Sequence, residues 1–142
     1  MKTQFVKPAS VERKWYVIDA TGKVMGRLAA KVASMVRGKT KAIFAPNQEL
    51  GDYVVVINAE KAVITGRKAQ QKQYYRHSGF VGGLKTSTYE KLVARHPTAP
   101  LEHAIKGMLP KGPLGRKMSK NVKIYAGAQH PHAAQNPTAI DL

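Results

Sequence analysis

The apolar positions in the first half of the chain change between strand-like and helix-like spacing. Residues 15–20 are aromatic and β-branched, which predicts a strand followed by a turn. Apolar residues at positions 25, 28, 32 and 35 or 36 recur at helical spacing, so a helix is predicted over residues 24–37, with Gly38 as its C-terminal cap. The unbroken β-branched run at residues 54–57 favours a strand covered on both faces, as in a parallel sheet.

The second half predicts shorter elements separated by glycine and proline. Residues 58–60 begin a short turn or helix, and residues 78–85 are expected to form a glycine-rich loop. The remaining expected elements are a strand over residues 73–77, a helix from Ser87 to Arg95 with capping-box spacing to Glu90, a short helix over residues 101–108, and a half-exposed strand over residues 121–126. This order predicts an α/β domain with a mostly parallel sheet.

The chain shows no repeat and no internal domain boundary, so its 142 residues are interpreted as one domain. Residues 1–13 are expected to form an extended basic N-terminal arm. Residues 14–126 are expected to form the α/β body, and residues 127–142 a loose C-terminal tail of small and polar residues.

Residues 106–117 combine four basic residues with three glycines, two prolines and no acid. Because proline fixes φ and glycine permits close approach, the segment is expected to be a stiff, basic loop between two structured elements. The residues expected to shape it are Gly107, Pro110, Gly112, Pro113 and Gly115. Two arrangements are open: either the whole segment contacts RNA, or Met108, Leu109 and Leu114 anchor it while Lys111, Arg116 and Lys117 reach phosphate. We favour the second.

Charge changes the picture more than any motif does. The chain has 24 Lys and Arg against 8 Asp and Glu, a net charge of +16 and a pI near 10.3. The excess is spread along the chain, so the folded body is expected to be basic on several faces. Nucleic acid is the leading partner and an anionic membrane surface the second. There is no cysteine, no apolar run of membrane-spanning length and no signal-peptide core, so we expect a soluble cytoplasmic protein with no membrane partner.

Two basic patterns are candidates for phosphate contact. Lys23, Arg27 and Lys31 lie four residues apart and would form one stripe on a helix, with no alternating acid. A solvated helix face is the other interpretation. The second pattern joins Arg76 to Tyr74, Tyr75 and His77, with Lys85 nearby; its tyrosines would either stack on unpaired bases or lie in the core.

The sequence offers little for catalysis. The strand-to-helix turn around Gly22 lacks the phosphate-loop and dinucleotide-binding patterns, so no nucleotide cofactor is expected. His130 and His132 lack an obvious third metal ligand. The eight acids are few for a two-metal nuclease, and turn or capping roles are assigned to Asp19 and Asp52. We therefore expect no enzyme, cofactor, metal or small-molecule substrate.

Several segments together carry a family resemblance. They are residues 15–20, 51–59, 77–83, 106–116, 125–127 and 130–135, and they occur in order over essentially the whole chain. The chain resembles the bacterial large-subunit ribosomal protein L-thirteen family. The resemblance implies a three-layer α/β/α fold with a four-stranded parallel sheet. It also implies a structural role in the large subunit, with large-subunit rRNA and neighbouring ribosomal proteins as partners. A part in early subunit assembly and messenger binding in autoregulation are further implications.

The interpretation is therefore a non-enzymatic rRNA-binding protein of the large ribosomal subunit. Two rivals are an enzyme acting on nucleotides and a regulatory protein that binds RNA or DNA away from the ribosome. The residues expected to contact RNA are Lys23, Arg27, Lys31, Lys39, Lys41, Arg76, Lys85, Lys106, Lys111, Arg116 and Lys117.

Overall fold

A parallel four-stranded sheet forms the centre of the computed structural model, which describes residues 5–141. Its strands are β1 (Trp15–Asp19), β2 (Tyr53–Ile57), β5 (Val122–Ile124) and β6 (Thr138–Ala139), in the order β5-β2-β1-β6. Trp15 pairs with Tyr53 in the register of the two central strands. The predicted parallel sheet is confirmed.

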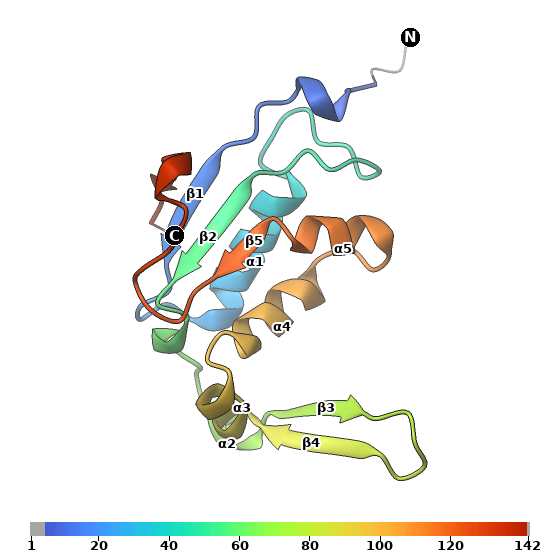
Figure 1. Ribbon diagram of the computed structural model, residues 1–142, viewed down its shortest axis with the longest axis vertical. Helices are drawn as coiled ribbons and strands as arrows, with labels where there is room; N and C mark the ends of the chain where they lie inside the picture. The colour runs from blue at the N-terminus through green and yellow to red at the C-terminus, as the bar shows by residue number, and fades with distance from the viewer. Residues whose placement is uncertain (1–4, 142) are drawn as a thin grey trace.

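Three helices cover one face of this sheet (Figure 1). They are α1 (Met25–Arg37), α4 (Ala99–Met108) and α5 (Pro113–Ser119). Helix α1 turns its apolar stripe inward, and Leu28, Val32 and Val36 are at most 2% exposed. The predicted helix and its cap at Gly38 are both confirmed.

The opposite face is covered by the C-terminal segment, which includes the short helix η3 (Ala133–Gln135). The His132 ring lies 5.2 Å from the Trp15 ring, and Trp15 stacks on Tyr53. Cover on both faces explains why Val54, Val55 and Val56 have no exposed surface, as the apolar run predicted. A four-stranded parallel sheet between covering layers agrees with the three-layer α/β/α fold.

The tail was expected to be loose, and this was wrong for its last part. Strand β6 pairs in parallel with β1, Tyr16 opposite Thr138 and Val17 opposite Ala139. Strand β6 has only two residues, which is too short to give a periodic signal in the sequence. It forms at the edge of the sheet through a few backbone hydrogen bonds to β1. At the other end, η1 (Pro8–Ser10) lies in the expected arm, and residues 1–4 of that arm lie outside the described range.

A β-hairpin projects away from the sheet (Figure 1). It consists of β3 (Gln73–His77) and β4 (Leu84–Thr88), which pair only with each other and antiparallel. Helices α2 (Lys68–Gln71) and α3 (Tyr89–Arg95) lie at its base. The strand over residues 73–77 is confirmed, although it does not join the parallel sheet.

Two predictions around this hairpin were wrong. Leu84 and Lys85 belong to β4 rather than to the glycine-rich loop, which is shorter than expected. Helix α3 begins at Tyr89 after Thr88, and no side chain caps it, so the capping box of Ser87 does not form. Pairing with β3 holds Ser87 in an extended strand, and this tertiary contact overrides the local capping signal.

The basic segment of residues 106–117, which we call the elbow, is not mainly a loop. Its first residues end α4 and its last residues lie in α5, so only residues 109–112 connect the two helices. Pro113 occupies the first turn of α5, where its missing N–H is not needed. Two helices therefore carry Lys106, Arg116 and Lys117, and Lys111 lies in the connection between them.

The short helix η2 (Ala59–Lys61) follows β2, as the turn or helix predicted there. Within residues 5–141, no helix has both the length and the apolar character needed to cross a membrane.

Candidate RNA-binding surface

The basic stripe predicted on the first helix lies at the start of α1, around one hollow. Lys23, Arg27 and Lys31 line a space of about 290 Å³ together with Val24 and Leu28. Arg27 and Lys31 are exposed and form no ion pair within the described residues, whereas Lys23 is ion-paired with Asp141. The structure thus brings the three predicted residues together and leaves two of them available to an anion.

The elbow gathers a second basic group. Lys106, Lys111 and Arg116 line a hollow of about 270 Å³ between the end of α4 and the start of α5. Lys106 forms an exposed i,i+4 pair with Glu102, at 3.3 Å, which is worth little in water. No acid lines this hollow, so its side chains present positive charge outward.

Close packing sets the shape of the elbow. A Cβ added to Gly115 would lie 1.7 Å from the backbone oxygen of Pro110, so only glycine allows α5 to approach the connection this closely. Leu109 is buried and Leu114 packs against the core, as the anchored arrangement predicted. Met108 is 46% exposed and does not anchor the segment, so that part of the prediction was wrong. Gly107 lies inside α4 with open space around it.

The hairpin holds a third group of cations. Arg76 and Lys85 are directly opposite each other in the strand register and line a hollow with His77 and Ser78. Of the two positions left open for the tyrosines, the core is not occupied by Tyr75, which is 64% exposed. Tyr74 is half-buried, with its ring 5.6 Å from that of His103. Burial of Tyr74 raises the pKa of its hydroxyl.

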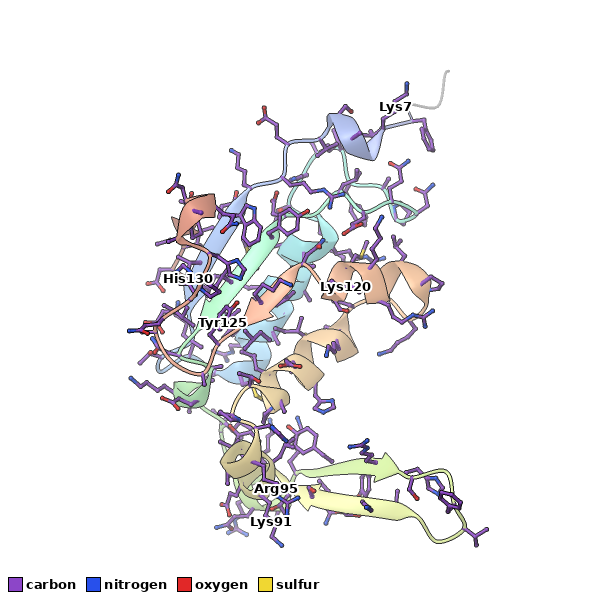
Figure 2. The ribbon with its side chains drawn as sticks, viewed as in Figure 1. Lys7, Lys91, Arg95, Lys120, Tyr125 and His130 are labelled. Atoms are coloured by element: carbon purple, nitrogen blue, oxygen red, sulfur yellow. The ribbon has the colours of Figure 1, made fainter. Side chains whose placement is uncertain are left out.

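The positive side chains extend to both ends of the molecule. Figure 2 shows Lys7 on the N-terminal arm, Lys120 after α5, and Lys91 and Arg95 on α3 beside the hairpin. This distribution agrees with the spread of charge along the sequence.

Some predicted cations are already paired with buried acids. Asp52, 4% exposed, lies 2.7 Å from Lys41, and Glu49, 5% exposed, lies 3.2 Å from Lys117 and 3.4 Å from Arg13. Asn121 donates a 2.6 Å hydrogen bond to Glu49. We call these six residues the charge network. Asp52, for which a turn or capping role was predicted, instead pairs with Lys41 and accepts a hydrogen bond from the backbone N–H of Lys14. Sequence reasoning missed the role of Glu49 because its partners are far away in the chain.

The remaining polar groups have structural contacts. Thr21 and Asn58 donate hydrogen bonds to the Asp19 carboxylate, and these lower its pKa from 3.8 to about 2. This is the turn role predicted for Asp19. His132 bonds the Tyr125 hydroxyl at 2.8 Å, and its backbone N–H donates to His130. Among residues 5–141, no three potential metal ligands lie close enough to hold an ion.

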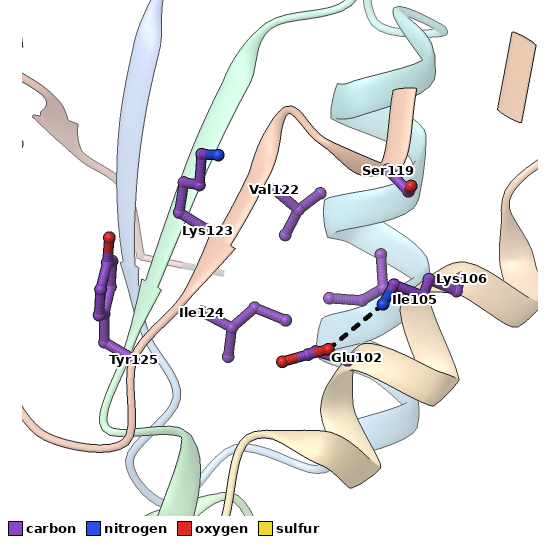
Figure 3. Close-up of a pocket in the computed structure, with 8 residues that line it drawn as sticks. All are labelled: Glu102, Ile105, Lys106, Ser119, Val122, Lys123, Ile124 and Tyr125. Carbon is purple, nitrogen blue, oxygen red and sulfur yellow. Dashed lines mark hydrogen bonds and ion pairs between the residues drawn. The ribbon is translucent and has the colours of Figure 1, made fainter. Parts of the chain in front are cut away.

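The hollow drawn in Figure 3 lies between α4 and β5 and has a volume of about 230 Å³. Ile105, Val122 and Ile124 line it, and its one acid, Glu102, is tied to Lys106.

Sequence comparison places this chain in a known family. Residues 13–131 match the family described as ribosomal protein L13. A protein of Treponema denticola named large ribosomal subunit protein uL13 is 61% identical over 142 residues, which is the full length of both chains. Proteins of the same name from Alteromonas mediterranea and Vibrio cholerae are 57% and 56% identical, again over both full lengths.

These matches place the chain in the class of structural ribosomal proteins. Proteins of this class act in translation, within a ribonucleoprotein, and are not enzymes. The chain belongs to the ribosomal protein L13 family. The family resemblance predicted from the sequence is confirmed, and the rival interpretation as a nucleotide-modifying enzyme is wrong.

Proposed function

We propose that the chain is a structural constituent of the large ribosomal subunit that binds large-subunit rRNA and works in the cytoplasm. The observation that carries this is the presence of three separate groups of cations, on α1, the elbow and the hairpin. A protein surrounded by RNA needs positive charge on several faces, whereas a protein that reads one groove concentrates it on one.

The residues proposed to contact RNA are the exposed Lys and Arg residues that form no ion pair with a buried acid. They are Arg27, Lys31, Lys39, Arg76, Lys85, Lys106, Lys111 and Arg116. Lys41 and Lys117 keep secondary roles, because each is already within ion-pair distance of a buried acid, and Lys23 does because it is only partly exposed and pairs with Asp141. Phosphate contacts of this kind position a protein on RNA without reading its sequence.

The shape of the protein surface would let it recognise a particular RNA structure, which positive charge alone cannot do. Structured RNA is recognised mostly through backbone shape, 2′-hydroxyls and unpaired bases. The close packing of Gly115 on Pro110 fixes how closely α5 approaches the connection, and so where the backbone presents its cations. Such preorganisation lowers the entropy lost on binding.

The salt dependence of rRNA binding tests the proposal. With about 6–10 phosphate contacts, affinity for an in vitro transcript of large-subunit rRNA should fall about 10³–10⁵-fold between 50 and 200 mM salt. A flat response contradicts the proposal. Co-sedimentation with large subunits in a gradient separates it from the rival protein that acts away from the ribosome.

Two finer roles follow from the family resemblance. We expect the protein to enter early assembly particles together with neighbouring ribosomal proteins, and depletion should then accumulate incomplete large subunits. The same basic groups would accept its own messenger, since phosphate contacts carry no sequence information. Competition between the messenger and rRNA for the purified protein tests that second role.

A further inference from the structure

The tip of the hairpin exposes apolar side chains a few residues from two cations that form no ion pair within residues 5–141. We propose that Phe80 and Val81 form a wedge that stacks on unpaired bases of the rRNA, while Arg76 and Lys85 hold the adjoining phosphates. This rests on the proposed function and assigns to the hairpin a contact with bases that charge alone does not provide.

The wedge is preformed by the turn that carries it. The Gly83 N–H donates to the Phe80 carbonyl at 2.9 Å, and the Ser78 N–H donates to the Gly83 carbonyl at 3.0 Å. Gly82 has φ +70°, which suits the third position of a type II turn and favours glycine. Phe80 and Val81 therefore occupy the first two turn positions and point outward without needing to reorder on binding.

Exposure of these side chains is extensive. Phe80 is 78% exposed and Val81 is fully exposed, and in the strands behind them Leu84 and Tyr75 are 59% and 64% exposed. Adjacent large apolar side chains exposed at the tip of a projecting element indicate an interaction site, because water gives them no compensating contact. No other part of the described chain covers the tip of the hairpin. The fold therefore does not require Phe80 and Val81 to be apolar.

The charges behind the tip identify the occupant as a polyanion. Arg76 and Lys85 face each other across the strands, and like charges in this position destabilise a hairpin. Residues 61–89 contain six Lys and Arg and no Asp or Glu, so no acid of this segment relieves the repulsion. A phosphate between Arg76 and Lys85 would turn that repulsion into two favourable contacts.

RNA supplies both features along one strand, whereas a neighbouring protein would need an apolar groove flanked by acids. Unpaired bases offer π faces on which an aromatic ring stacks, and phosphates lie on the same strand at close spacing. The combination of an apolar wedge with flanking cations is therefore better matched to a bulged or looped RNA segment than to an apolar protein surface.

The test compares Phe80→Ala with the unaltered full-length chain on an in vitro transcript of large-subunit rRNA. Loss of one stacked base should weaken binding about 5- to 150-fold, and the slope of affinity against salt should stay unchanged because stacking releases no counterions. Phe80→Trp should retain the affinity. The matched control, Ile43→Ala, removes another exposed apolar side chain, 42% exposed and outside the hairpin, and should bind like the unaltered chain.

The outcomes separate this inference from the proposed function. If the unaltered chain shows no salt-dependent binding, the proposed function fails and the inference with it. If that binding is present but Phe80→Ala has the same affinity, only the inference is overturned. Normal affinity for the transcript with reduced incorporation into large subunits would assign the tip to a protein neighbour, which also overturns it.

Discussion

The charge network and the hairpin use the same basic residue types for different purposes. In the charge network, Lys41 and Lys117 lie beside acids that are almost fully buried. In the hairpin, Arg76 and Lys85 lie beside each other, and no acid occurs between residues 61 and 89. One region uses its cations to hold the chain together, and the other leaves them available.

The difference follows from the cost of burying a carboxylate. Glu49 and Asp52 leave water when the fold forms, and each must gain cations or hydrogen bonds in return. The cations that supply this are no longer fully available to RNA. The number of Lys and Arg residues is therefore larger than the number that are available to RNA. The cations that pair with buried acids are the ones to leave out.

The largest expected effect is the loss of stability in Glu49→Ala. Removing this acid leaves Asn121 without its partner and Arg13 and Lys117 without a countercharge. We expect the free energy of unfolding to fall by about 2–3 kcal/mol, at the low end for buried pairs because both cations reach water. Urea unfolding measures it, with the exposed Glu60→Ala as control. Equal stability of the two variants would show that the network is not structural.

The double variant Arg76→Ala, Lys85→Ala should behave in the opposite way. Two lost phosphate contacts should weaken rRNA binding about tenfold at 0.15 M salt and lower the salt slope by about 1.5. Stability should be unchanged or slightly raised, because the like-charge pair is gone. Filter binding over a salt series, with thermal unfolding alongside, measures both. An unchanged slope would remove the hairpin from the RNA-binding surface.

The double variant Lys111→Ala, Arg116→Ala extends the comparison to the elbow. Both side chains are exposed and form no ion pair within residues 5–141, so thermal stability should change by less than about 0.5 kcal/mol. Affinity for rRNA should fall about five- to tenfold, with a lower salt slope. The same affinity as the unaltered chain would refute the assignment of these two residues.

The smallest expected effect concerns Asp19, an exposed acid stabilised by hydrogen bonds rather than by ion pairs. Its folded pKa of about 2 lies below the ordinary value of 3.8, so its ionised form favours folding above about pH 4, and this contribution is lost as the pH falls toward 2. Asp19→Asn should lower the unfolding temperature at pH 6 and have less effect at pH 2. A deficit that is equal at both pH values would contradict the pKa.

The sequence predicted elements whose local signal agreed with their packing. Helix α1 has an apolar stripe and a terminal Gly38, and β2 has a run that suits burial on both faces, so both were found with near-correct bounds. The capping box of Ser87 failed because strand pairing outweighed a local hydrogen bond. Strand β6 was missed because it depends on β1, which lies far away in the chain.

In the candidate RNA-binding surface, too, the sequence predicted the local features and missed those that depend on long-range contacts. Charge spacing identified Arg27 and Lys31 as neighbours on one helix, since helical periodicity is a local property. The burial of Glu49, and with it the structural use of Lys117, depends on residues 68 positions apart meeting in space. The exposed tip at Phe80 had one signal, two apolar residues inside a glycine-rich loop, which sequence reasoning did not use.

By itself, the sequence determined the α/β class, the excess of positive charge, the scarcity of catalytic groups and the family, because each depends on composition or on local order. The tertiary structure decided which cations are available, that the elbow is a pair of helices, and that the hairpin projects with an apolar tip. These depend on burial and on long-range pairing, since the free energy of a charged or apolar side chain is set by its neighbours in space.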